Sequence, residues 1–276
     1  MEGGTVVLTG ATSGIGLATA RALASRTERL VVHGPETEVD VAPLLAELRA
    51  SAAGDVDYVQ ADYGDLGSVV RLAEAVYELT PEIDVLVNNA GRPGAPRRTL
   101  TGNGREATWQ VNYLAPILLT SLLCAHGAVR RIVNVASATH FSAALTLDDP
   151  DLAHHAYSPS AAYARSKLAL VTYTGWLARH LPSGTSAAVS MHPGVIATEL
   201  LHAMFSVGGG SPESAAINVV AVASASNDNG TYYDERTPVP PAPDAQDPAA
   251  QDLLHELTDR QLAAYGGWQG NIGRRV

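Results

Sequence analysis

Short runs of apolar and β-branched residues recur along the chain, and longer stretches of mixed polarity separate them. A short run that is apolar throughout is typical of a strand that is buried on both faces of a parallel sheet. Gly, Pro, Asp or Asn follows most of these runs, which supports a strand that ends there. The pattern predicts strands at residues 5–9, 29–33, 55–60, 84–88, 131–135, 186–191 and 230–233.

Between the runs, apolar residues return every three or four positions, as on one face of a helix. Helices are predicted from the glycine-rich stretch 10–16 to Ala24 and at 42–52, 68–79, 104–125, 161–180, 212–225 and 249–265. Pro116 lies inside one of them and should kink it or loosen one turn. Strands that alternate with helices indicate right-handed crossovers. We therefore predict an α/β fold, a doubly wound parallel (Rossmann) sheet of about seven strands with helices on both faces.

This sheet is expected to form a single domain over residues 1–276, with three additions. An insertion spans 138–162, a substrate lid lies near 195–212, and a C-terminal extension covers 236–276. The lid is predicted from an apolar stretch at 199–205 that runs into three glycines at 208–210, a pattern that suits a hinged segment. Two alternatives remain for these parts: ordinary surface segments, or packing of Met204 and Phe205 on a neighbouring subunit.

Composition excludes several classes of function. The net charge of −10 and the pI of about 5.3 argue against binding to a phosphate backbone, so no nucleic-acid partner is expected. The amino terminus runs directly into a strand, and no apolar run approaches the ~18 residues that span a bilayer. The single cysteine, Cys124, has no internal partner, and the nine histidines lack metal-ligand spacing. We expect a cytoplasmic protein without a membrane partner or a metal.

The stretch Gly10-Ala11-Thr12-Ser13-Gly14-Ile15-Gly16 lies between the first strand and the first helix. Glycines let the backbone turn tightly and allow a pyrophosphate to come close, while the helix start offers free N–H groups. In this strand–turn–helix context the spacing predicts a dinucleotide-binding turn. The ordinary alternative is that these glycines only form a turn.

Further polar residues follow the later strands. Asn88, Asn89 and Gly91 come after the fourth strand, Ser137 after the fifth, and the stretch 192–194 after the sixth. Because the carboxyl ends of parallel strands meet at one edge of a sheet, these residues should converge beside the glycine turn.

Tyr163 and Lys167 lie four positions apart and so project from one face of a predicted helix. An ammonium group one turn away should favour the phenolate and lower the pKa of Tyr163 from its usual ~10. Lys167 is the one lysine among the eighteen basic residues of the chain. Arginine is bulkier and more diffuse in charge, so it does not replace lysine in this role.

These motifs, together with Val111-Asn112-Tyr113 and Pro193-Gly194, resemble the short-chain dehydrogenase/reductase family in order and spacing. The glycine spacing is similar to the short, non-extended branch, and the pattern of helix and insertion is nearest to retinol-dehydrogenase-like reductases. The resemblance implies a proton transferred by Tyr163, a pKa-lowering and ribose-binding role for Lys167, a substrate oxygen held by Ser137, and a water anchored by Asn112.

The resemblance also implies a nicotinamide dinucleotide as cofactor. Its expected contacts are Gly10, Thr12, Ser13, Gly14, Ile15, Gly16, His33, Gly34, Asp62, Tyr63, Asn89, Ala90, Gly91, Tyr163, Lys167, Pro193, Gly194, Val195, Ile196 and Thr198. Strand two ends without the aspartate that NAD-preferring relatives carry, and the arginine of NADP-preferring relatives is absent too. Thr12, Ser13 and His33 remain to contact a phosphate, so NADP(H) is favoured over NAD(H), with Glu36 near enough in sequence to reverse this.

The leading hypothesis is hydride transfer between nicotinamide and a ketone or secondary alcohol, on a sizeable apolar or secondary-metabolite substrate. Thr139, Phe141, Tyr157, Leu201 and Phe205 are the expected substrate contacts. Two alternatives stay open: a non-redox cyclase, dehydratase or epimerase on the same fold, and a non-catalytic dinucleotide sensor. Assembly as a homodimer or homotetramer is also left open.

Overall fold

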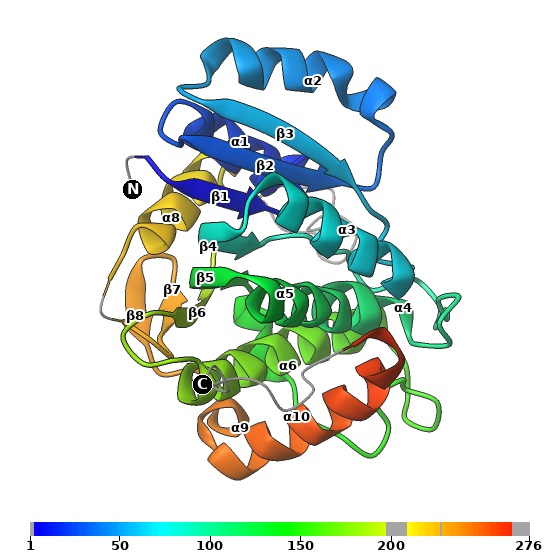
Figure 1. Cartoon of the computed structure of the whole chain (residues 1–276). Coiled ribbons are helices and arrows are strands. Elements are labelled where there is room, and N and C mark those ends of the chain that lie inside the picture. Colours follow the sequence, from blue (N-terminus) through cyan, green and yellow to red (C-terminus); the bar gives the residue numbers. More distant parts are fainter. Residues whose placement is uncertain (1–2, 197–208, 227, 267–276) are drawn as a thin grey trace.

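The computed structural model describes residues 3–196, 209–226 and 228–266. Its centre is an eight-stranded sheet in the order β3-β2-β1-β4-β5-β6-β7-β8 (Figure 1). The strands from β1 to β7 pair in parallel, and β8 pairs antiparallel with β7. The bounds are β1 Thr5–Leu8, β2 Arg29–Gly34, β3 Asp55–Gln60, β4 Glu82–Asn88, β5 Ala128–Val135, β6 Ala187–His192, β7 Tyr232–Asp234 and β8 Thr237–Val239.

The predicted doubly wound parallel sheet of about seven strands is confirmed, and the structure has eight. The eighth strand forms a short hairpin with β7, in which Tyr233 pairs with Pro238. Pro238 belongs to the predicted C-terminal extension 236–276, where no strand was expected, and proline cannot donate a hydrogen bond to a sheet. An edge strand tolerates it, since its outer side needs no partner.

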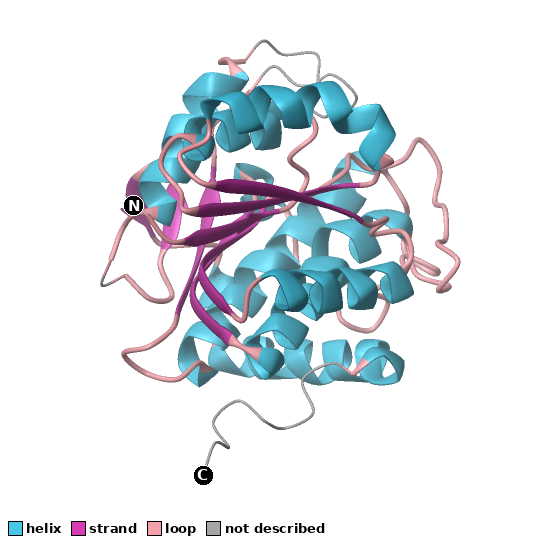
Figure 2. Cartoon of the chain, turned by 45° about the horizontal axis from the view of Figure 1, so that its top comes forward, coloured by secondary structure: helices cyan, strands magenta, loops and turns pink. Residues whose placement is uncertain are grey.

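Helices cover both faces of the sheet, as Figure 2 shows. In β1, Val6 and Leu8 pack into one core cluster and Val7 into the other, which is the alternation of a strand buried on both sides. One face carries α1 Gly14–Ala24, α2 Glu38–Ser51 and α8 Pro212–Ala223. The opposite face carries α3 Leu66–Leu79, α5 Ala115–His126 and α6 Pro159–His180.

The helix predicted at 104–125 is interrupted, as expected for Pro116. It consists of α4 Ala107–Trp109, a π-helical turn at Gln110–Leu114 and then α5. Pro116 has no N–H, so the α-helical hydrogen bond to the carbonyl of Asn112 cannot form. One residue earlier, the N–H of Ala115 bonds to the carbonyl of Gln110, five residues back, rather than to that of Val111. Asn112 therefore lies in a wider turn than a regular helix would give it.

The insertion at 138–162 is fastened to the sheet and to α6. It begins with a 3₁₀ turn, Ala138–Ser142, and continues as a loop around the buried carboxylate of Asp149. This carboxylate accepts the backbone N–H groups of Ala153, His154 and His155 at 2.7–2.8 Å. Arg165 of α6 donates to the carbonyl of Asp149 at 2.7 Å. The loop is thus held by the helix that also carries Tyr163 and Lys167.

The C-terminal extension is part of the same domain. Helices α9 Pro243–Gln246 and α10 Pro248–Leu262 pack on α6, and a 3₁₀ turn, Ala263–Tyr265, follows (Figure 1). Asn103 donates to the hydroxyl of Tyr265 at 2.7 Å, and His140 accepts the N–H of Ala242 at 3.2 Å. None of the described helices combines the length and the apolar character that crossing a bilayer requires.

Candidate active site

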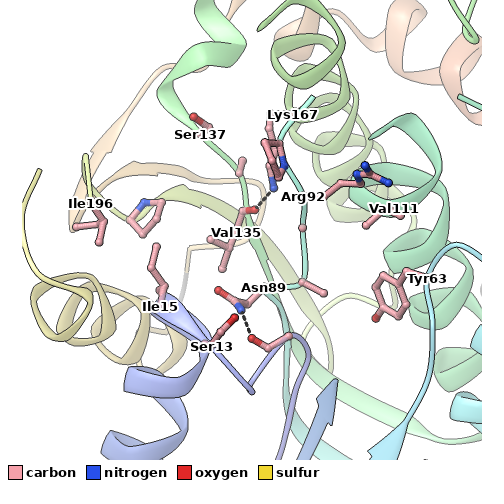
Figure 3. Close-up of a pocket in the computed structure, with 18 of the residues that line it drawn as sticks. Ser13, Ile15, Tyr63, Asn89, Arg92, Val111, Val135, Ser137, Lys167 and Ile196 are labelled. Carbon is pink, nitrogen blue, oxygen red and sulfur yellow. Dashed lines mark hydrogen bonds between the residues drawn. The ribbon is translucent and has the colours of Figure 1, made fainter. Parts of the chain in front are cut away.

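The carboxyl ends of the parallel strands open on a cavity of about 1020 Å³ (Figure 3). The glycine turn, the segments after β4 and β5, the helix α6 and the segment after β6 contribute to its wall. The predicted site residues that line it are Gly10, Thr12, Ser13, Gly14, Ile15, Gly16, His33, Asp62, Tyr63, Asn89, Ala90, Gly91, Ser137, Thr139, Tyr163, Lys167, Pro193, Gly194, Val195 and Ile196. The expected convergence at one edge of the sheet is therefore present.

The glycine turn packs tightly against the segment after β4. A Cβ atom at Gly16 would stand 1.9 Å from the carbonyl oxygen of Gly10 and 2.5 Å from Nδ2 of Asn89, so only glycine fits. The side-chain amide of Asn89 donates to the carbonyls of Thr9 and Gly10, both at 3.0 Å. These contacts hold the turn at the mouth of the cavity and leave its outer backbone open.

The amino terminus of α1 offers unpaired donors to this cavity. Ser13 is the N-cap residue, yet its side chain makes no capping hydrogen bond, and the first turn contains no acidic residue. Gly14, Ile15 and Gly16 of that turn line the cavity. A helix start with free N–H groups and no local carboxylate binds anions such as a pyrophosphate. These residues therefore fit a dinucleotide.

His33 is buried at the end of β2 with both ring nitrogens engaged. Nδ1 accepts the N–H of Gly10 at 3.2 Å, so Nε2 carries the proton and donates to the carbonyl of Ala61 at 3.0 Å. Burial lowers the pKa of His33 to about 4 despite the Ala61 hydrogen bond. The ring stacks on Tyr63, with centroids 4.8 Å apart. His33 is thus neutral and holds the glycine turn, and it has no free N–H for a phosphate.

Glu36 lies near this end of the cavity, among its lining residues. A Cβ atom at Gly34 would stand 2.7 Å from Oε2 of Glu36 and 3.0 Å from Oγ1 of Thr12. The carboxylate of Glu36 therefore lies over the end of β2. The backbone there is fixed, because Tyr58 donates to the carbonyl of Glu36 at 2.7 Å. Gly34 itself lies beneath Thr12 and Glu36 and does not line the cavity.

Ser137, Tyr163 and Lys167 are all buried at the inner end of the cavity. The hydroxyl of Ser137 accepts the N–H of Thr139 at 3.2 Å, which fixes it as the cap of the following 3₁₀ turn. The ammonium group of Lys167 donates to the carbonyl of Val135 at 2.9 Å, the bond drawn in Figure 3. It lies 5.7 Å from the centroid of the Tyr163 ring.

The pKa values of this pair are set by burial. Burial raises the pKa of Tyr163 to about 12, although a hydrogen bond with Ser137 acts in the opposite direction. Burial lowers the pKa of Lys167 to about 8. The expectation that Lys167 pulls the pKa of Tyr163 downward is therefore wrong for this geometry, because burial of the phenol outweighs it and the ammonium group donates to the carbonyl of Val135. At neutral pH Tyr163 is a phenol that can give up a proton.

Asn112 lies behind the cavity and does not line it. Its Oδ1 accepts the N–H of Arg92 at 2.8 Å, and its Nδ2 donates to the carbonyl of Arg92 at 3.0 Å and to Oγ of Ser166 at 3.1 Å. It thereby joins the segment after β4 to α6. A Cβ atom at Gly91 would stand 3.3 Å from Oδ1 of Asn112 and 3.4 Å from Nζ of Lys167, which explains a glycine at this point.

The remaining predicted residues are placed differently. Phe141 is half exposed beside His140 and Tyr232 and is absent from the described lining of the cavity. Tyr157 is absent from it as well, since its hydroxyl donates to the carbonyl of Ala95 at 2.9 Å and fastens the insertion to the segment after β4. Thr198, Leu201, Phe205 and most of the predicted lid lie outside the described residues.

Two charged or polar lining residues received no role in the sequence analysis. Arg92 directly follows the Asn-Asn-Ala-Gly stretch, and that position was the available signal. His192 ends β6, and its Nδ1 is buried without a hydrogen-bond partner among the described residues. In the described part of the chain, no group of three or more His, Cys, Asp or Glu residues is arranged to hold a metal ion.

Known proteins resemble this chain in sequence and in structure. A family model described as short chain dehydrogenase matches residues 4–206. Human retinol dehydrogenase 13 is 33% identical over 268 residues, which are 90% of this chain and 81% of that protein. A candidate daunorubicin C-13 ketoreductase from Streptomyces sp. (strain C5) is 36% identical over 200 residues, 72% of this chain and 68% of that protein.

Two solved structures share the fold. A crystal structure of an uncharacterised protein from Mycobacterium paratuberculosis is 30% identical with a TM-score of 0.78, and the match covers 94% of this chain and 93% of that one. A short chain dehydrogenase from Burkholderia cenocepacia J2315, solved in complex with NADP, is 24% identical with a TM-score of 0.66. That match covers 84% of this chain and 96% of that one.

The glycine turn gives a first prediction. Gly16→Ala forces the carbonyl of Gly10 and the amide of Asn89 apart, so dinucleotide affinity should fall roughly tenfold or more. Titration of a nicotinamide dinucleotide into the folded variant measures this. Gly102→Ala is the matched control, because a Cβ there meets nothing within 4 Å. Equal affinity in the two variants would show that the close approach does not shape the binding site.

The burial of Lys167 gives a second prediction, on stability. Its pKa of about 8 lies below the unfolded value of 10.5, so the unfolded state binds more protons between these pH values. The free energy of unfolding of the natural protein should therefore rise with pH from 8 toward 10. Lys167→Met removes the buried charge and should be more stable at pH 7 by about 2 kcal/mol, after the lost hydrogen bond to Val135 is counted.

Denaturant unfolding of both proteins from pH 7 to pH 10 measures this difference. The advantage of Lys167→Met should shrink as the pH rises, because the natural protein loses its buried charge. Arg97→Met removes an exposed charge and serves as the control, with no such trend. A stability difference for Lys167→Met that stays constant with pH would contradict the assigned cause.

Proposed function

The chain belongs to the short chain dehydrogenase family, and from this premise we propose that it reduces a ketone to a secondary alcohol, or catalyses the reverse. As a family member it is an NAD(P)-dependent oxidoreductase. One observation carries the finer proposal: Ser137, Tyr163 and Lys167 meet at the inner end of a single cavity whose other end is built for a dinucleotide.

The residues of this chain supply binding, orientation and a proton. The hydroxyls of Ser137 and Tyr163 are close enough for a hydrogen bond between them, so both can address one carbonyl oxygen. When bound, the reduced nicotinamide supplies the hydride. With that hydride delivered to the carbonyl carbon, Tyr163 would give its proton to the carbonyl oxygen, so that the C=O double bond would become an alcohol. The ammonium group of Lys167 lies 5.7 Å from the centroid of the Tyr163 ring, where it is expected to bind the ribose hydroxyls of the cofactor.

The cavity wall supports a substrate with a sizeable apolar part. Val111, Ala138, Val195 and Ile196 are apolar residues of its lining. Apolar lining with a few convergent polar groups is typical of small-molecule sites. Thr139 stays a proposed substrate contact, since it lines the cavity next to Ser137, whereas Phe141 is not among the described lining residues. The named relatives act, by their names, on retinol and on a daunorubicin ketone, and both molecules are large.

For the cofactor, the position of Glu36 outweighs the sequence-based preference for NADP(H). The carboxylate over the end of β2 is suited to accept hydrogen bonds from the ribose hydroxyls of the adenosine and repels a phosphate there. Asp62 is the second acidic lining residue. We therefore expect NAD(H) to bind better than NADP(H).

Tyr163→Phe tests the proton transfer. It should lower turnover by ~10²–10⁴-fold, because the general acid is lost, and should leave dinucleotide affinity nearly unchanged. Steady-state kinetics and a cofactor titration measure the two effects separately. Tyr77→Phe, on the exposed side of α3, is the control and should behave as the natural protein does. A Tyr163→Phe variant with normal turnover would refute the assigned chemistry.

The cofactor preference is tested by titrating NADH and NADPH at the same ionic strength. The natural protein should bind NADH more tightly, by roughly tenfold. Glu36→Ala should bind NADPH more tightly than the natural protein does, since it removes the repulsion of the phosphate. Glu38→Ala, two positions along on the exposed start of α2, is the control and should change neither affinity. Tighter binding of NADPH to the natural protein would overturn the role given to Glu36.

A further inference from the structure

Arg92 is a cation in the wall of the cavity, and among the described residues it has no partner of opposite charge. Its side chain is half-buried and lines the cavity beside Val111 and near Lys167 (Figure 3). It makes no hydrogen bond or ion pair with any residue that the structure describes. Other arginines of the fold are engaged: Arg131, for example, forms a bidentate pair with Asp228 at 2.6–2.7 Å.

The backbone of Arg92 is fixed to α6, the helix that carries Tyr163 and Lys167, through the side chain of Asn112. The amide of Asn112 bonds both its N–H and its carbonyl, and the same amide bonds Ser166 of α6. On the next residues, the carbonyl of Ala95 is held by Tyr157 of the insertion. A long side chain on such a fixed base can place its guanidinium reproducibly in relation to Tyr163 and Lys167.

Two acidic residues, Glu36 and Asp62, line the cavity, and its cationic lining residues are Lys167 and Arg92. Figure 3 draws Arg92 beside Lys167, with Val111 and Tyr63 on its other side. Lys167 is already directed at Val135 and at the position expected for a ribose. Figure 3 places Ser13 and Ile15 of the pyrophosphate-binding turn across the cavity from Arg92, so the cofactor phosphates do not account for it. The guanidinium is left for the substrate.

A guanidinium presents five N–H donors in a planar fork that matches a carboxylate in two parallel hydrogen bonds. On this basis we propose that the substrate is a keto acid, or the corresponding hydroxy acid, whose carboxylate binds Arg92 while its ketone faces Ser137 and Tyr163. The apolar wall then receives the carbon skeleton between the two groups. This inference rests on the proposed function and specifies its substrate class.

The test uses a matched pair of ketones, 4-benzoylbutyrate and its methyl ester, which differ in the negative charge. The natural protein should reduce the acid with a kcat/KM at least tenfold above that of the ester. In Arg92→Leu, kcat/KM should fall for the acid and stay unchanged for the ester, so that the preference is lost. Arg92→Lys should retain part of the preference. Arg97→Leu, an exposed arginine of the same segment, is the control. Equal use of acid and ester, or an equal loss for both in Arg92→Leu, overturns the inference.

A binding measurement separates this inference from the proposed function. Calorimetric titration of 4-benzoylbutyrate into the dinucleotide-bound protein needs no turnover. Binding that weakens at least tenfold in Arg92→Leu, but not in Arg97→Leu, supports the carboxylate site even if neither ketone is reduced. Absent binding, or equal affinity in the natural protein and Arg92→Leu, overturns it. Reduction of the ester alone would support the proposed function and refute the carboxylate site.

Discussion

The burial of one ammonium group constrains the whole catalytic end of the molecule. The side chain of Lys167, in α6, is buried. Burying a charge is costly in free energy unless the charge is paired or hydrogen-bonded. The chain meets this cost with the carbonyl of Val135 at the end of β5 and with little else among the described residues. Gly91 packs closely against this group, since a Cβ there would stand 3.4 Å from Nζ of Lys167 and 3.3 Å from Oδ1 of Asn112. The free-energy cost of burying the Lys167 charge is therefore only partly offset. A buried charge is weakly screened, so it acts strongly on charged or polar groups bound beside it.

The rest of the site follows from keeping that charge in place. The π-helical turn before Pro116 presents Asn112 toward α6, where it joins Ser166 to the backbone of Arg92. Asp149 and Arg165 hold the insertion against the same helix. Segments from three parts of the chain are thereby fixed to α6, so Arg92 and the insertion keep their positions relative to Tyr163 and Lys167. The dinucleotide end depends on a separate close contact, between Gly16 and the carbonyl of Gly10.

The sequence predicted the features that depend on local pattern. Apolar runs located seven of the eight strands, and the motif spacing brought Gly10, Ser137, Tyr163 and Lys167 to one edge of the sheet, because strand ends determine that arrangement. It did not predict what depends on side-chain direction. Three such features depend on contacts between distant segments or on side-chain rotamers. They are the hydrogen bond of His33 to Gly10, the carboxylate of Glu36 over β2, and the guanidinium of Arg92, which has no partner among the described residues. The predicted direction of the Tyr163 pKa was wrong for the same reason. The four-residue spacing of Tyr163 and Lys167 does not show how deeply the phenol is buried or that the ammonium group donates to Val135.

The central claim is that a hydride passes directly between the nicotinamide and a substrate carbon in this cavity. The most direct test is to supply reduced cofactor deuterated at the transferring C4 position and to analyse the product alcohol by mass spectrometry and NMR. The account predicts one deuterium on the carbinol carbon, with none introduced at that carbon from D₂O when unlabelled cofactor is used. A product without cofactor-derived deuterium, formed without consumption of reduced cofactor, would contradict it and would indicate the non-redox alternative on the same fold.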